Sequence, residues 1–119
     1  MKNLIACPAE RAVYFLGGKW KIRILFSLLQ NKKIRFGELK KGLKTITQQM
    51  LSKQLKELEI DGIVNRKVYQ VVPPKVEYSL TEFGLSVMPI LRSFSEWSKK
   101  NTRTIAVKLN KNFEENRIT

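Results

Sequence analysis

The architecture follows from residues 36–80, FGELKKGLKTITQQMLSKQLKELEIDGIVNRKVYQVVPPKVEYSL, where the apolar period changes once. In the first part, apolar residues recur at helical spacing, which predicts one helix over 36–43 and another over about 48–60. Thr47 is a favourable N-cap for the second helix. Over 63–80, β-rich and alternating residues on either side of a Pro-Pro pair predict a hairpin.

The rest of the chain completes a mainly helical fold. The sequence predicts a helix from Pro8 to about Leu16, a helix from Lys19 to about Leu29, a very short strand at Ile34-Arg35, and a long helix capped by Thr81 and reaching about Lys100. Pro89 lies inside the last pattern and should kink that helix. The polar tail, residues 101–119, is either a short helix or disordered.

We therefore predict a mainly α fold with a small β-hairpin (α+β), a winged helix-turn-helix over residues 1–100. In this geometry the second helix of the helix-turn-helix enters the major groove of DNA.

Composition narrows the function. The chain has 119 residues, with 23 Lys and Arg against 10 Asp and Glu, a net charge of +13. A compact chain this basic is expected to bind a polyanion, here double-stranded DNA. With one cysteine and no histidine, neither a zinc site nor a His-dependent catalytic triad is expected, and no cofactor is implied. No run of about 18 apolar residues suggests a membrane span, so we expect a cytoplasmic protein.

The exposed side of the helix over 48–60 carries side chains that can read bases. Gln pairs with adenine, Lys reaches guanine acceptors, and Ser serves either. The predicted base-reading residues are Gln48, Gln49, Ser52 and Lys53. The predicted contacts to the DNA backbone are Arg35, Lys40, Lys41, Lys44, Thr47, Lys56, Arg66, Lys67 and Lys75. Lys19 and Lys21 are weaker candidates for the same role.

Five motifs in fixed order carry a family resemblance: CPAERAVYFLGGKWKIRILFSLL (7–29), IRFGELKKGL (34–43), LSKQLKELEIDGIVNRKVY (51–69), VPPKVEYSLTEFG (72–84) and SFSEW (93–97). On these motifs the chain resembles the HxlR-type winged-helix transcriptional regulators of bacteria. It departs from the family pattern at Gly37, where Asn is frequent, and at Thr45-Ile46-Thr47, where Gly-Ile-Ser is frequent.

The resemblance implies a homodimer formed through the first and last helices, with two recognition helices on two half-sites. The apolar surface of the last helix agrees with this, although intramolecular packing would also explain it. The expected dimerisation residues are Val13, Leu16, Phe83, Val87, Leu91, Phe94 and Trp97.

The lone cysteine, Cys7, precedes Pro8 at the start of the first helix, a position that favours a reactive thiolate. Some members of the HxlR family sense oxidants, quinones or aldehydes through a cysteine in this region, so the resemblance makes Cys7 a candidate sensor. Two alternatives stay open: Cys7 is a small apolar residue, or the effector is a small molecule bound without a covalent bond.

The sequence thus predicts a dimeric, sequence-specific transcriptional regulator, with repression as the family's commoner mode. The alternative is a nucleic-acid-binding protein without sequence preference, such as a nucleoid or RNA-associated factor. A module that docks protein is disfavoured by the net charge. An enzyme is not expected, because Glu57 and Glu59 are two apart on a helix and face different ways.

Overall fold

The computed structural model describes residues 6–118 and divides into two compact units, one ending at Ser86 and one beginning at Val87. None of the helices in this part of the chain is sufficiently long and apolar to cross a membrane. The assignment of residues 1–100 to one DNA-binding domain stays a prediction. Residues 1–5 and 119, which fall under the domain assignments, lie outside the described residues.

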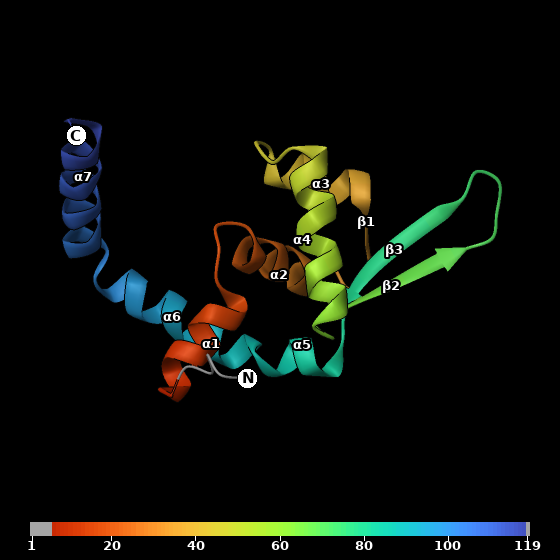
Figure 1. The fold of residues 1–119 in the computed structure, drawn as a ribbon, viewed down its shortest axis with the longest axis horizontal. Helices are drawn as coiled ribbons and strands as arrows, with labels where there is room; N and C mark the ends of the chain where they lie inside the picture. The colour runs from red at the N-terminus through yellow and green to blue at the C-terminus, as the bar shows by residue number, and fades with distance from the viewer. Residues whose placement is uncertain (1–5, 119) are drawn as a thin grey trace. The chain divides into compact units, whose positions relative to one another are not determined.

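Four helices in the first unit follow the predicted order: α1 (Pro8–Leu16), α2 (Lys21–Gln30), α3 (Phe36–Leu43) and α4 (Gln48–Ile60) (Figure 1). Their apolar stripes form its core, because the leucines and isoleucines at helical spacing turn inward together. The most deeply buried helix side chains are Ile24, Leu25, Leu28, Leu39, Leu51, Leu55 and Leu58.

The wing is a three-stranded antiparallel sheet rather than a hairpin alone. Strands β2 (Val64–Tyr69) and β3 (Lys75–Leu80) pair as predicted, and β1 (Ile34–Arg35) pairs with the other side of β3. The prediction of a very short strand at Ile34-Arg35 is therefore confirmed, and its partner is now identified. This pairing ties the start of α3 to the wing, because α3 begins directly after β1.

A hydrogen-bonded junction fixes the base of the wing. The Thr81 backbone N–H donates to the Ile63 carbonyl at 3.0 Å, and the Thr81 hydroxyl accepts from the Gly84 N–H at 2.9 Å. Gly84 belongs to α5 (Glu82–Ser86), whose backbone passes so close to Ile63 that a Cβ on Gly84 would lie 2.3 Å from the Ile63 carbonyl oxygen. Thr81 caps a helix as predicted, but that helix is short.

The second unit consists of α6 (Met88–Lys100) and α7 (Thr102–Ile118). The prediction of a single helix from Thr81 to Lys100 is wrong, because a turn at Val87 separates α5 from α6. Pro89 explains the difference. It lies in the first turn of α6, where its missing N–H costs no hydrogen bond, instead of kinking a helix interior. The tail, left open by the sequence, is helical to Ile118.

Candidate nucleic-acid interface

Helix α4, the predicted recognition helix, has one side buried and the other side exposed. Leu51, Leu55 and Leu58 are at most 1% exposed and hold the helix against the core. At its N-terminus the Thr47 hydroxyl accepts a hydrogen bond from the Met50 N–H at 3.1 Å, as predicted for an N-cap. The free side carries the four predicted base-reading side chains, all exposed: Gln48, Gln49, Ser52 and Lys53.

The turn between α3 and α4 places a cation beside that N-terminus. Lys44 has φ +63° and ψ −72°, and the Thr45 N–H donates to the Leu43 carbonyl at 2.8 Å, so these three residues form a γ-turn. Leu43 and Ile46 on either side are buried and hold the turn in place. Lys44 is thereby kept exposed, in a backbone conformation that residues other than glycine rarely adopt.

An open hollow joins the recognition helix to the wing. Its lining residues are Phe36 from α3, Ser52, Lys56 and Glu59 from α4, Arg66 from β2 and Tyr78 from β3. The structure thus brings three predicted DNA contacts, Ser52, Lys56 and Arg66, to one place. Glu59 was not among the predicted site residues, and its spacing of seven from Ser52 is the signal that places it on the same side of α4.

The cations around α3 are spread along its surface. Arg35 and Lys41 are exposed, and Lys40 is half-buried. The Arg35 N–H donates to the Glu38 carboxylate at 3.2 Å, which satisfies one backbone group at the helix start and leaves the Arg35 side chain outside that bond. The Arg35 and Lys41 side chains are accessible to solvent, and the predicted contacts of all three cations with phosphates stay predictions.

Lys21 has a different role from the one considered for it. Its ammonium lies 3.1 Å from the Glu57 carboxylate, and its side chain is only 13% exposed. The pair links α2 to α4 and occupies the charge of Lys21, and the weaker prediction that Lys21 contacts the DNA backbone stays a prediction. Lys19 instead lies over the Trp20 ring at 4.9 Å, with Arg23 also over that ring.

The wing separates its predicted contacts onto two faces. Side chains directly opposite each other in an antiparallel ladder share a face. Arg66 pairs with Tyr78 on the face lining the hollow, whereas Lys67 pairs with Glu77 on the other face. We call the latter the outer face; Arg35 opposite Glu77, and Tyr69 opposite Lys75, also belong to it.

Tyr69 and Glu77 on the outer face form a linked pair that sequence reasoning did not single out. The pKa of Glu77 lies below its ordinary value, chiefly because the Tyr69 hydroxyl donates a hydrogen bond to the carboxylate; Lys75 and Lys33 act in the same direction, and desolvation opposes them. The same hydrogen bond raises the pKa of Tyr69. From the sequence, the pairing of Tyr69 with Lys75 across the hairpin was the signal that could have revealed this group. That pairing depends on the exact hairpin geometry.

Cys7 and the residues expected at a dimer interface differ in how exposed their side chains are. Cys7 is exposed at the N-cap of α1, and its carbonyl accepts from the Arg11 N–H at 3.0 Å. Val13, Phe83, Phe94 and Trp97 are exposed and Val87 is half-buried, whereas Leu16 and Leu91 are buried within the chain. Their joint role in a dimer stays a prediction.

Comparison with known proteins places this geometry in a family. A family model described as HxlR-like helix-turn-helix matches residues 15–106. An uncharacterised HTH-type transcriptional regulator of Halalkalibacterium halodurans is 50% identical over 101 residues, which cover 85% of this chain and 89% of that protein. The redox regulator HypR in its reduced form has a TM-score of 0.80 at 46% identity, covering 85% of this chain and 99% of that chain. The reduced form of the transcriptional regulator YodB from B. subtilis has a TM-score of 0.71 at 35% identity, covering 81% and 94%.

Proposed function

The chain belongs to the HxlR-like helix-turn-helix family of transcriptional regulators, and on that premise we propose that it binds specific operators in double-stranded DNA as a homodimer and acts as a repressor. The observation that carries the proposal is the exposed side of α4, where two Gln, one Ser and one Lys stand free beside a capped N-terminus. These side chains can discriminate base edges in the major groove, which a purely electrostatic binder does not need.

Backbone contacts supply affinity and orientation around this helix. Lys41, Lys44 and Arg35 lie at or beside α3, and Lys56 and Arg66 line the hollow beside α4. A dimer that neutralises about 6–10 phosphates should lose roughly 10³–10⁵-fold in affinity between 50 and 200 mM salt. The repressor assignment rests on repression being the commoner mode of the family, in which an operator bound across a promoter blocks transcription.

Regulation by oxidants or electrophiles at Cys7 is the second part of the proposal. Its support is the exposure of Cys7 at a helix start and the similarity to HypR, a redox regulator. In one route the thiolate adds to an electrophile. In the other, two Cys7 thiols of a dimer lose two protons and two electrons to an oxidant and form an intersubunit disulfide.

A continuous set of contacts supports coupling between Cys7 and the DNA-binding elements. Cys7 is the N-cap of helix α1, and this helix carries Phe15, whose ring centroid lies 6.1 Å from that of Phe83 on α5. The start of α5 is bonded through Thr81 to Ile63, between α4 and the wing. A displacement of α1 can therefore reach both elements through packed and hydrogen-bonded groups.

The experiment that tests the function is selection of bound duplexes from a random library at about 0.15 M salt, a condition in which specific contacts compete with counterions. Reduced protein should select a pseudo-palindrome with half-sites about one helical turn apart. Gln49→Ala should change the consensus, while Lys41→Ala should weaken binding to all sequences alike. Salt-sensitive binding with no consensus would instead support the nucleic-acid binder without sequence preference.

The same selection after mild thiol oxidation tests the sensor. Wild-type protein should lose or change its consensus, and Cys7→Ser should be indifferent to the treatment. An identical consensus in both states would contradict the role of Cys7 and favour an effector bound without a covalent bond.

A further inference from the structure

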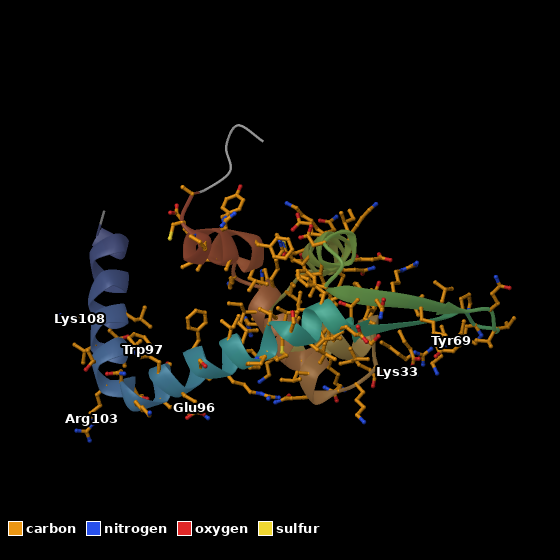
Figure 2. All side chains as sticks on the ribbon, turned by 90° about the horizontal axis from the view of Figure 1, so that it is seen from below. Lys33, Tyr69, Glu96, Trp97, Arg103 and Lys108 are labelled. Carbon is orange, nitrogen blue, oxygen red and sulfur yellow. The ribbon has the colours of Figure 1, made fainter. Side chains whose placement is uncertain are left out.

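The outer face of the wing carries more basic than acidic side chains. Arg35, Lys67 and Lys75 share this face with one acid, Glu77, and Lys33 precedes β1 close enough to affect the titration of both Glu77 and Tyr69. Four cations thus stand around one carboxylate. Figure 2 labels Lys33 and Tyr69 beside the hairpin.

Tyr69 is at the centre of this group. The Lys67 ammonium lies 4.8 Å from the centroid of the Tyr69 ring, and the Lys75 ammonium lies 5.0 Å from it. Both distances are within the range at which a cation is attracted to an aromatic ring. One half-buried ring therefore holds two lysines, one from each strand.

Glu77 fixes the ring and one of the lysines. Its carboxylate lies 3.6 Å from the Lys75 ammonium, and its interaction with the Tyr69 hydroxyl is the main cause of its lowered pKa. At neutral pH Glu77 is charged and Tyr69 keeps its proton, and the lowered pKa of Glu77 and the raised pKa of Tyr69 both favour these states. The lysines are thus ordered before any ligand arrives, which reduces the side-chain entropy lost on binding.

We propose that Tyr69 is a positioning residue of the DNA interface, whose ring holds Lys67 and Lys75 in place for phosphates bordering the minor groove. This rests on the proposed DNA-binding function. The polyanion is assigned as DNA because the group lies in the distal part of a hairpin whose other face lines the hollow beside the recognition helix.

Groove geometry explains how both faces of the wing reach the same duplex. The minor groove is about 6 Å wide and is bordered by two phosphate backbones. A two-stranded arm along that groove turns one face toward each backbone. Arg66 then serves the strand on the side of the hollow, and the pair Lys67 and Lys75 serves the opposite strand.

The test compares Tyr69→Leu with Tyr69→Phe, two variants that leave the charge unchanged. The readout is the salt dependence of affinity for a labelled duplex, measured by fluorescence anisotropy. Tyr69→Leu should lose one phosphate contact per subunit. This loss makes the negative slope of log K against log salt shallower by about 1.8 per dimer and lowers the affinity at 0.15 M salt by roughly 30-fold. Tyr69→Phe keeps the ring and should retain most of the wild-type slope.

Two control substitutions keep the result interpretable. Val68→Ala, at an exposed position on the opposite face of the same strand, should leave the slope unchanged. Lys75→Gln should lower the slope in the wild-type background but have a much smaller effect in Tyr69→Leu, because its ammonium is no longer held there. This comparison between the two backgrounds shows whether Lys75 acts through the ring, and Tyr69→Phe, which keeps the ring, answers the question if Tyr69→Leu alters the folding of the hairpin.

Contrary outcomes separate this proposal from the proposed function. A wild-type slope in Tyr69→Leu would overturn the role of Tyr69 and leave the outer face to an acidic protein partner. Failure of Tyr69→Phe to retain the slope would overturn the role of the ring. A lowered slope in Tyr69→Leu, in a protein that selects no consensus, would support the wing proposal while contradicting sequence-specific regulation.

Discussion

Among single residues, Glu77 shows how one neighbouring hydroxyl shifts the titration of a carboxyl group. The Tyr69 hydroxyl stabilises the carboxylate form, and this is the main reason for the lowered pKa of Glu77. In Tyr69→Phe that donor is gone, so the pKa of Glu77 should rise toward its ordinary value. Carboxyl ¹³C chemical shifts followed through an acid titration would measure it, and an unchanged pKa would contradict the assignment.

The sign of the effect on folding follows from the direction of the shift. A carboxyl group with a lowered folded-state pKa stabilises the protein above its unfolded-state pKa, and this contribution is lost as pH falls through the folded-state pKa. The Tyr69-Glu77 pair should therefore weaken in acid, where Glu77 takes up a proton, and in strong base, where Tyr69 loses its proton. At neutral pH the ring, the carboxylate and Lys75 should remain together.

Gly84 is the residue whose missing side chain has the largest steric consequence. A Cβ there would lie 2.3 Å from the Ile63 carbonyl oxygen, which is backbone and cannot rotate away. Gly84→Ala should separate α5 from the base of the wing and cost about 1–3 kcal/mol of unfolding free energy. Urea denaturation would measure the loss. Gly37→Ala, at a helical site with open space around it, is the matched control and should not destabilise the fold.

At the scale of the element, the Lys21-Glu57 pair connects α2 to the recognition helix. Its atoms are 3.1 Å apart and Lys21 is mostly buried, whereas Glu57 is 40% exposed, which screens the interaction. A double-mutant cycle with Lys21→Gln and Glu57→Gln should give a coupling of about 0.5–1 kcal/mol. The exposed pair Lys99-Glu96, with atoms 4.0 Å apart, should give a coupling near zero. Equal couplings would contradict a special role for the first pair.

Local signals explain which elements could be predicted from sequence. The bounds of α3 and α4 and the Thr47 cap follow from leucine spacing and from a side chain bonding its own helix, and all are confirmed. The break at Val87 was missed, because an apolar pattern that continues through Pro89 fits one kinked helix as well as two helices.

The candidate site was predictable to the same extent. Exposure of Gln48, Gln49, Ser52 and Lys53 follows from helical periodicity, and the structure agrees. The pairing of Lys21 with Glu57 and the two faces of the wing depend on contacts between distant segments and on strand register. No local pattern encodes those features, so they required the structure.

At the scale of the whole molecule, the exposed apolar side of α6 is the feature that bears on assembly. Ile90, Phe94 and Trp97 lie at spacings of four and three and are more than half exposed, with Trp97, labelled in Figure 2, at 63%. If this surface forms the proposed dimer, Phe94→Glu with Trp97→Glu should yield monomers in sedimentation experiments. Operator affinity should then fall by about 100-fold or more, because two linked half-sites become one.

A control substitution at an exposed apolar residue outside α6 tests whether this result is specific. Ile60 is an apolar residue at the end of α4 that is even more exposed, at 73%, and Ile60→Glu should leave the oligomeric state unchanged. Dimers that persist in the α6 double variant would contradict the assignment of this surface.

The γ-turn at Lys44 sets the stability of the fold against DNA binding at one position of the chain, and this conflict limits which residues evolution can place there. Glycine adopts φ +63° without steric cost, so Lys44→Gly should stabilise the fold by about 1 kcal/mol after the extra entropy of its unfolded chain is counted. The same change removes a cation from beside the N-terminus of α4 and should weaken DNA binding. Thermal melting and duplex titration of this one variant should therefore move in opposite directions. Selection for heat resistance and selection for operator occupancy would favour different residues at this position, and a lysine there is expected only while occupancy matters more.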